Sequence, residues 1–349
     1  MNRPAVLIAV LLLLLLQAAA RAENDSTADP LFVSDDVLEV RVVAPFDAIA
    51  RERPTDEDVA GKLYFEAEDG EMIALDIGIR TRGRFRRDAD VCAFPPLRLN
   101  LKKSQIRDSL FDGQDKLKLV THCRPRSHIY EQALLVEYLA YRILNLLTDY
   151  SFRVRLLIVN YASEEQDSGF HNYAFLIEHK NRLAKRIGIP ALSLSRTSVA
   201  SLDASHSNLT SVYQYLIGNT DFASTSGPQG TECCHNYSLF GSSDGGQYSI
   251  PYDFDMSGIV DAPYALPNPK LPLESVRERL YRGFCANNAL LPDTLAQFRN
   301  KRGDIEALIQ DQPGLSSSSR RSMLQYINEF YRTISSERSV NRLIIAKCR

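Results

Sequence analysis

The sequence predicts an α+β protein whose first half is rich in strands and whose second half is mainly helical. Apolar and polar residues alternate through much of the first half, which is the pattern of strands with one buried face. Apolar residues at helical spacing prevail from about residue 207 onward. The chain has 349 residues, 44% of them hydrophobic, which is enough for one large domain or two closely joined lobes.

The N-terminal residues predict export. Residues 1–22 combine a basic start, an apolar run and a small-x-small site ending at Ala22, as a cleaved secretory signal does. An uncleaved membrane anchor is the alternative, but the apolar run is short for a full span, and no later run is longer. The polar and acidic residues 23–36 then predict a flexible leader.

The cysteines agree with export to an oxidising compartment. They are even in number, which predicts disulfide bonds, and they stand at Cys92, Cys123, Cys233, Cys234, Cys285 and Cys348. Their order along the chain pairs Cys92 with Cys123. The adjacent Cys233 and Cys234 are expected to bond to different partners. The spacing typical of zinc sites is missing, since there are no CxxC pairs or clustered histidines.

The first half contains the predicted strands, which are 37–43, 62–85, 95–103, 151–162 and 172–179. The clearest is "MIALDIGIRTRGRF" (72–85), and four arginines follow on one of its faces: Arg80, Arg82, Arg84 and Arg86. This basic ridge is either a solvated edge strand or an anion site that Gly83 lets a ligand approach closely. The strand that follows carries Arg98 on its polar face.

Helical spacing predicts a helix over 127–147, where Glu131 extends the apolar stripe. An acid there is either buried with a partner or placed in the first turn by the helix dipole. A second helix is expected over 207–217, with Ser207 or Asn208 as its cap and Gly218 at its end.

Helix-forming segments then recur to the end of the chain, at 272–283, 291–310 and 319–336. Between them and the second helix, "HNYSLFGSSDGGQYSIPYDFD" (235–255) predicts a hairpin. If Asp244 and Gly245 form its turn, Leu239 pairs with Ile250 and Tyr237 with Tyr252.

Polar residues at the open ends of this hairpin predict a ligand site. The same register sets Asn236 opposite Asp253, and Asp255 shares the face of Asp253 if the strand continues. Amide and carboxylate oxygens suit Mg²⁺, Mn²⁺ or Ca²⁺. The alternative is ordinary loop chemistry, because Asn and Asp are common where strands end.

The order of helix, "GNTD", loop, "HN", hairpin and "YDFD" resembles protein-kinase-like folds. "LIGNTD", "HNYSLF" and "IPYDFD" are similar to segments of HipA-type kinases and, more closely, of CotH-type secreted kinases. "IRTRGRFRR", "FPPLRLNLKK" and "NYAFLIEH" add to the CotH-type resemblance, which then covers about 75–260. It implies a two-lobed protein-kinase-like fold with a strand-rich N-lobe (37–180) and a mainly helical C-lobe (181–349).

The resemblance also implies roles for single residues. Asp221 would orient or deprotonate the attacking hydroxyl, and Asn236 and Asp253 would hold Mg²⁺ or Mn²⁺ against the ATP phosphates, with Asp255 assisting. Further nucleotide-binding positions are also implied: Arg82, Glu131, which would steady a phosphate-binding cation, and Glu178 at the adenine-side hinge.

The sequence departs from the family pattern in two respects. The loop between Asp221 and Asn236 is longer than in HipA-type kinases, and the expected phosphate-binding lysine is not evident. Arg98 and Lys118 are the candidates to replace it, although an arginine is not equivalent to a lysine on phosphate.

The function expected from this resemblance is that of a secreted or periplasmic kinase, which transfers the γ-phosphate of ATP to a hydroxyl of an exported protein. The alternatives are an inactive relative that binds a nucleotide or a partner, and a secreted calcium-binding module using Asp221, Asp253 and Asp255. The common phosphate-loop, dinucleotide, HExxH and GxSxG motifs are missing. The net charge of −2 favours neither nucleic acid nor acidic membranes, and no membrane span is expected in the mature chain.

Overall fold

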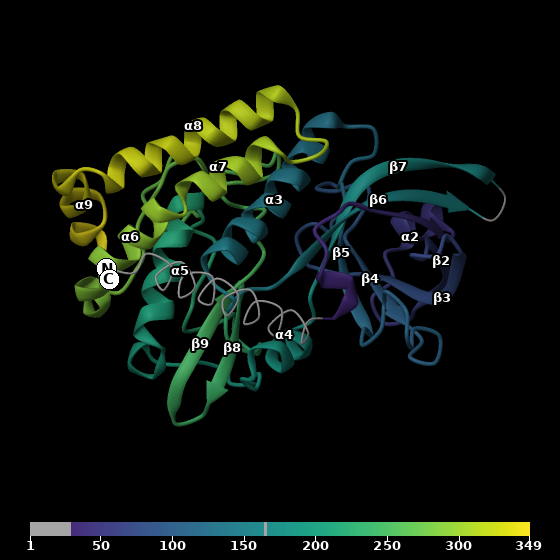
Figure 1. Cartoon of the computed structure of the whole chain (residues 1–349), viewed down its shortest axis with the longest axis horizontal. Coiled ribbons are helices and arrows are strands. Elements are labelled where there is room, and N and C mark those ends of the chain that lie inside the picture. The colour runs from purple at the N-terminus through teal and green to yellow at the C-terminus, as the bar shows by residue number, and fades with distance from the viewer. Residues whose placement is uncertain (1–28, 164–165) are drawn as a thin grey trace, which may run out of the picture.

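The computed structural model describes residues 29–163 and 166–349, and its strand-rich part is a closed barrel (Figure 1). Seven strands follow one another around the barrel in the order β1-β2-β3-β4-β5-β7-β6. They are β1 (Leu38–Val43), β2 (Val59–Glu66), β3 (Met72–Thr81), β4 (Leu97–Leu101), β5 (Lys116–Val120), β6 (Val154–Ser163) and β7 (Gln166–Ile177). All neighbours pair antiparallel except β1 and β6, whose parallel pairing closes the barrel.

Alternation along the strands fills the barrel interior. On β3, Leu75, Ile77 and Ile79 are buried, whereas the residues between them are partly exposed. Leucines at alternate positions of β4 point to the same interior. Because a closed barrel has no edge, Arg80 on β3 does not protect an open sheet edge.

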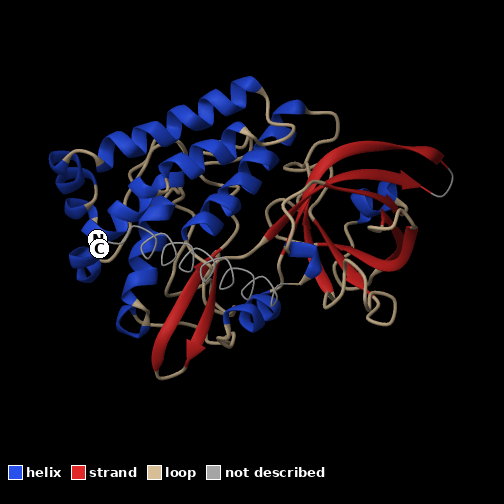
Figure 2. Ribbon diagram, in the orientation of Figure 1, coloured by secondary structure: helices blue, strands red, loops and turns tan. Residues whose placement is uncertain are grey.

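The remaining chain forms a helical part beside the barrel (Figure 2). Its helices are α3 (His128–Leu147), α4 (Lys180–Ile187), α5 (Ala204–Ile217), α6 (Leu291–Asn300), α7 (Arg302–Gln310), α8 (Ser317–Ile334) and α9 (Glu337–Leu343), while α2 (Phe46–Glu52) lies with the barrel. The hairpin β8 (Tyr237–Ser242) and β9 (Gly245–Pro251) completes it. Helix α3 lies at the centre of this part, since its Leu135, Leu139 and Ile143 are fully buried in the hydrophobic core that the helices share.

The predicted two-lobed protein-kinase-like fold, with a strand-rich N-lobe and a mainly helical C-lobe, is wrong. The described residues form a closed seven-stranded mixed barrel with eight α-helices. Alternation reveals which segments are strands but not how the strands close. Closure depends on the parallel pairing of Val40 with Val159 and on strand β5, which the sequence patterns missed.

Several element boundaries also differ from expectation. The segment 62–85 is two strands, β2 and β3, with Gly70 at positive φ between them. The segment 291–310 divides into α6 and α7. Helix α5 begins earlier than expected, because the side chain of Asp203, not that of Ser207 or Asn208, caps it.

Residues 272–283 do not form the predicted helix. Two arginines of this segment instead donate to backbone carbonyls of other segments. Arg279 reaches Leu216 and Tyr326, and Arg282 reaches Thr220 and Phe222. These tertiary hydrogen bonds hold the segment in a non-helical path against other parts of the chain.

The described residues contain three disulfides and no free cysteine. Cys92 bonds Cys123, as predicted. The expectation for the adjacent pair is wrong, because Cys233 and Cys234 bond each other. The physical reason is that the fold brings Cys285 to Cys348, which leaves these neighbours with each other. Disulfide bonds fit an extracellular protein.

The leader is ordered over its last part. Leu31 and Phe32 belong to the barrel core and are at most 4% exposed, so the expected flexibility of 23–36 does not extend to them. The predicted signal segment lies outside the described residues. Within the described ranges, every helix is too short or too polar to cross a membrane.

Candidate functional site

A cavity of about 560 Å³ lies where the β3–β4 loop meets the segments around the hairpin. The barrel contributes residues 82–86 and Pro96. The helical part contributes the following residues: Asp221, Pro228, Thr231, Glu232, Cys234, His235, Asn236, Tyr252, Asp253, Asp255 and Met256. Asp221, Asn236, Asp253, Asp255 and Arg82 therefore line one cavity, although they are far apart in sequence.

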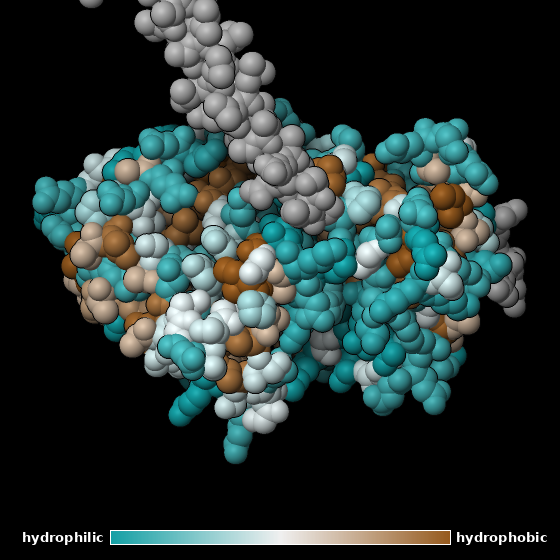
Figure 3. Space-filling model, turned by 60° about the horizontal axis from the view of Figure 1, so that its bottom comes forward, coloured by the Kyte–Doolittle hydropathy of each residue, from teal (hydrophilic) through white to brown (hydrophobic). Residues whose placement is uncertain are grey.

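Hydrophilic and hydrophobic residues are unevenly distributed over the surface. On the face shown in Figure 3, the barrel side is mostly hydrophilic, whereas hydrophobic residues gather over the helical side. The cavity lining is mixed in character, since Phe85 and Met256 lie beside the arginines and carboxylates.

Asp221 is held at the end of α5 by backbone geometry. Gly218 ends the helix at φ 66°, where an added Cβ would overlap the hydroxyl of Tyr326. The side chain of Asn219 then accepts a hydrogen bond from the Asp221 backbone N–H at 3.0 Å. This tight turn directs Asp221 away from the helix, and its side chain is 36% exposed.

Two consecutive residues hold the Asp221 carboxylate. His235 Nε2 lies 2.9 Å from Asp221 Oδ1, and Asn236 Nδ2 donates to Asp221 Oδ2 at 3.0 Å and to its carbonyl at 2.7 Å. The hydrogen bond that His235 donates to the Asp221 carboxylate raises the pKa of His235, which burial alone would lower. Both oxygens of the acid are therefore oriented by neighbours.

The hairpin register differs by one residue from the prediction. Leu239 pairs with Ser249 and Tyr237 with Pro251, because the turn is at Ser243 and Asp244 and the pairing is irregular between Phe240 and Ser242. The Gly241 that lies in this irregularity has φ 128°, a conformation that favours glycine.

Asn236 consequently does not lie directly opposite Asp253. The backbone N–H of Tyr252 donates to the Asn236 carbonyl at 3.0 Å, and β9 ends at Pro251, so Asp255 is not on a continuing strand. Asn236 and Asp253 both adopt positive φ, 56° and 66°. Such backbone conformations concentrate at functional sites.

Asp253 is anchored through its backbone and leaves its carboxylate accessible. Its N–H donates to the hydroxyl oxygen of Tyr141 at 2.8 Å. Its side chain is 39% exposed and lies 3.7 Å from Arg86 Nη2. Of the two acids Asp253 and Asp255, Asp253 is therefore the accessible one, since the Asp255 side chain is only 8% exposed.

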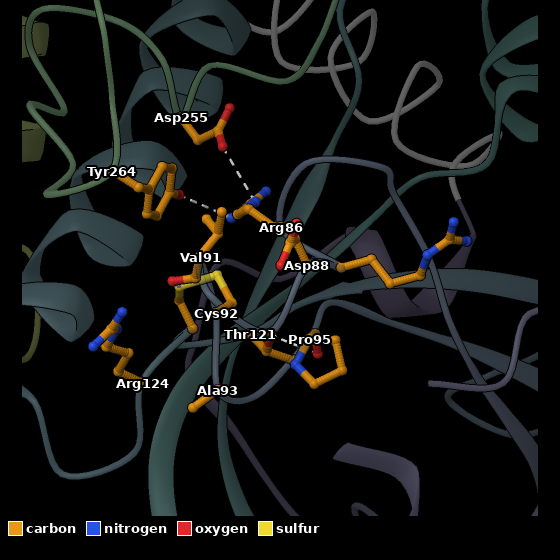
Figure 4. The surroundings of a disulfide bond; sticks show 12 residues. Arg86, Asp88, Val91, Cys92, Ala93, Pro95, Thr121, Arg124, Asp255 and Tyr264 are labelled. Carbon is orange, nitrogen blue, oxygen red and sulfur yellow. Dashed lines mark hydrogen bonds and ion pairs between the residues drawn. A yellow bond between two sulfur atoms is a disulfide. The ribbon is translucent and has the colours of Figure 1, made fainter. Parts of the chain in front are cut away.

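Arg86 joins the barrel to the helical part (Figure 4). Its Nε lies 3.2 Å from Asp255 Oδ2, and its Nη1 lies 3.4 Å from Glu137 Oε2 and 3.3 Å from the hydroxyl of Tyr264. The four arginines predicted on one face of a strand therefore do not share a strand. Strand β3 ends at Thr81, before three of them, and the Arg86 side chain is buried.

The loop that carries Arg86 is fixed at several points. The Cys92–Cys123 disulfide ties it to the segment after β5, as Figure 4 shows. Arg53 donates to the carbonyls of Arg87 and Cys92 at 2.6 and 2.8 Å. The guanidinium is therefore held in place on the barrel side.

Three carboxyl groups lie around the single positive charge of Arg86. Burial raises the pKa of Glu137 to about 8 and that of Asp255 to about 6, although Arg86 opposes both shifts. Glu137 Oε1 is also buried without a hydrogen-bond partner. Three carboxylates, with Asp253 as the third, thus share one guanidinium, so the cluster has room for a further proton or cation.

Two more cations lie near Asp253. Arg82 lines the cavity, and burial together with Arg86 lowers its pKa. Lys118 on β5 lies over the ring of Tyr252 at 4.5 Å, and burial lowers its pKa to about 8. Arg82 Nε is buried without a hydrogen-bond partner, so this side chain has donor capacity for an anion.

Four of the predicted nucleotide-binding residues lie outside the cavity lining: Lys118, described above, and Glu131, Glu178 and Arg98. Glu131 Oε1 accepts from the Tyr173 backbone N–H at 3.5 Å. Glu178 forms a buried two-point ion pair with Arg186, with N–O distances of 2.9 Å. Arg98 faces outward from β4, paired across the sheet with Lys118.

Glu137, not Glu131, is the helix acid that meets a site cation. The two lie six residues apart on α3, and they therefore point in different directions around the helix. Sequence reasoning missed Glu137, although a signal existed. It is the single acid within the otherwise apolar run "ALLVEYLAY" (133–141), and a buried acid needs a partner.

A metal site made only by the protein is not preformed. Over residues 29–163 and 166–349, no group of three or more His, Cys, Asp or Glu side chains is arranged to hold a metal ion. Asp253 and the Asn236 amide are nevertheless oxygen donors of the kind Mg²⁺ prefers. Since Mg²⁺ often takes one or two protein carboxylates and completes its shell with phosphate and water, this donor set fits a metal that enters with a phosphate ligand.

Comparison with known proteins finds no family model, curated protein or solved structure that matches this chain. The resemblance to CotH-type kinases therefore depends on the short sequence motifs alone. The arrangement of Asp221, Asp253 and the arginines carries the functional argument.

Proposed function

We propose that the chain is an exported phosphotransferase, which moves the γ-phosphate of ATP to a hydroxyl of an exported protein, with Mg²⁺ or Mn²⁺ entering together with ATP. One observation carries the proposal. The oriented carboxylate of Asp221 faces the same cavity as the guanidinium of Arg82 and the accessible carboxylate of Asp253. Secretion into a bacterial periplasm or outside the cell belongs to the same proposal.

Asp221 receives the acceptor hydroxyl in this reaction. Its carboxylate accepts the hydroxyl proton as the acceptor oxygen bonds to the γ-phosphorus, while the bond from that phosphorus to the leaving ADP oxygen breaks. His235 and Asn236 keep the carboxylate in place, which preserves the in-line geometry that phosphoryl transfer requires.

The cations of the site bind the phosphate oxygens. Arg82 supplies a guanidinium with free donor capacity, and Lys118 adds a positive charge close to Asp253. Asp253 and Asn236 would hold the metal, which neutralises charge on the phosphates when bound. Arg86 has a different role, since it is engaged by Asp255 and Glu137 and thereby positions the Asp253 segment.

Transfer of labelled phosphate tests the proposal. Purified protein is incubated with γ-labelled ATP and Mg²⁺ or Mn²⁺, with casein and with a peptide mixture as acceptors. We expect Asp221→Asn and Asp253→Ala to lower the rate by about a hundredfold or more. Asp244→Asn, an exposed acid at the hairpin tip, is the matched control and should leave the rate unchanged. Equal transfer by all four proteins would refute the assignment.

A nucleotide-binding protein without catalysis is the second candidate. It is favoured by the ion pair that engages Asp255 with Arg86 and by the lack of a preformed three-acid metal group among the described residues. In that case ATP would raise the melting temperature without any transfer of phosphate. Stabilisation by Ca²⁺ alone would instead indicate a calcium-binding module.

A further inference from the structure

A second cavity, of about 410 Å³, is lined on one side by Tyr248 of the hairpin. It is formed where the end of α3, the first turns of α5 and α6, and strand β9 come together, all within the helical part seen in Figure 1. Its lining shares no residue with the candidate phosphotransfer cavity. Its volume is within the range of small-molecule sites.

Aromatic rings form one wall of this cavity. Tyr150 and Tyr248 stack with ring centroids 4.7 Å apart, and the ring of His206 meets Tyr248 edge-on at 5.6 Å. Each stacked ring has one face turned away from its partner. The face of a tyrosine ring attracts cations.

The histidine of this wall presents a hydrogen-bond acceptor. His206 is 6% exposed, and its Nε2 lies 3.1 Å from the carbonyl of Ser249. Because a carbonyl can only accept, Nε2 carries the proton. Burial lowers the pKa of His206 to about 4, so the ring is neutral at pH 7 and Nδ1 has a free lone pair. No described residue forms a hydrogen bond with that Nδ1.

Two carboxylates and one amide oxygen add further acceptors to the lining, beside the hydroxyls of Thr148, Ser205 and Thr294. Asp203 and Asp293 contribute carboxylates, and Gln297 donates its Nε2 to the Leu147 carbonyl at 2.8 Å, which leaves its amide oxygen as an acceptor. No lysine or arginine is among the described residues that line the cavity.

The two carboxylates give the cavity a negative charge, and the partial charges of the nearby helix ends are too small to reverse it. The N-termini of α5 and α6 each carry about half a positive elementary charge, and the C-terminus of α3 carries about half a negative one. The carboxylates of Asp203 and Asp293 outweigh the sum of these ends. The cavity therefore retains net negative charge.

We infer that this cavity is a binding site for an organic cation rich in N–H donors, namely a guanidinium or primary ammonium group. The cation would lie against the outer tyrosine face and donate to His206 Nδ1 and to the two carboxylates. Such a group is offered by a free small molecule or by an arginine or lysine side chain. This inference does not depend on the proposed phosphotransfer.

Isothermal titration of the full chain with arginine amide tests the site. We expect binding of arginine amide, weaker binding of tetramethylammonium because it has no N–H donor, and no heat from acetate. Asp293→Asn should weaken arginine amide about five- to tenfold, and Tyr248→Leu should weaken it by a similar factor. Melting temperatures without ligand establish that each variant is folded.

Two control variants locate the binding. Asp47→Asn removes a first-turn acid of α2 outside the cavity, and Asp253→Asn removes an acid of the other cavity, so neither should change the affinity. No binding of arginine amide, or equal weakening by Asp47→Asn and Asp293→Asn, would overturn the inference. A blocked Gly-Arg-Gly peptide that binds at least as tightly as arginine amide identifies a side chain as the ligand, whereas binding of arginine amide alone identifies a free small molecule.

Discussion

Replacing Glu137 with glutamine should change how the stability of the protein depends on pH. Burial raises the pKa of this carboxyl from an ordinary 4.5 to about 8. Between these two values the unfolded chain has lost the proton while the folded protein keeps it. Unfolding therefore releases a proton, and the stability contributed by this group is full below pH 4.5 and is lost as the pH rises toward 8.

The size of the effect follows from the shift. Each pH unit in this window costs about 1.4 kcal/mol, so the group lowers the free energy of unfolding by about 4 kcal/mol over the three units from roughly pH 5 to pH 8. Glu137→Gln keeps the shape of the protonated acid and removes its titration. We expect the variant to match the natural protein near pH 5 and to exceed it in stability above pH 8.

Urea denaturation across this pH range measures the difference. Glu131→Gln is the matched control, because it removes an acid of the same helix that does not contact Arg86. An equal gain in stability of Glu131→Gln above pH 8 would contradict the assignment of the effect to the cluster around Arg86. A Glu137→Gln difference that stays constant from pH 5 to pH 9 would refute a protonated Glu137 at neutral pH.

Three further substitutions separate structural from functional roles. Arg186→Met leaves the buried Glu178 unpaired and should lower the free energy of unfolding by about 3 kcal/mol in urea titrations. At a temperature where the variant is folded, its affinity for ATP should be unchanged. Weaker ATP binding would support a nucleotide role for Glu178. His235→Gln should flatten the phosphotransfer pH profile around neutrality. Protonated His235 holds the Asp221 carboxylate in an ion pair, and this inhibition is lost as the pH rises through the raised pKa of His235. An unchanged profile contradicts the pairing. Gly218→Ala should lower thermal stability by about 2 kcal/mol or more, because an alanine at positive φ is strained and its Cβ meets a tyrosine hydroxyl; an unchanged melting temperature contradicts this packing.

Local pattern alone determined much of the secondary structure. Alternation located most barrel strands, helical spacing located α3 and α5, and the Asp-Gly pair located the hairpin to within one residue of its register. These signals are read from neighbours along the chain, because side-chain periodicity repeats within a single element. The order of Asp221, Asn236 and Asp253 around that hairpin likewise pointed to one shared cavity.

Long-range contacts decided the rest. The barrel closes through β1 and β6, which no local pattern pairs, and Arg86 becomes the centre of an acid cluster because a disulfide-tethered loop brings it to α3 and to the segment after β9. The choice of Glu137 over Glu131 depends on which side of α3 faces that loop. Such choices minimise unpaired buried charge across segments distant in sequence, and only the assembled tertiary structure brings those charges together.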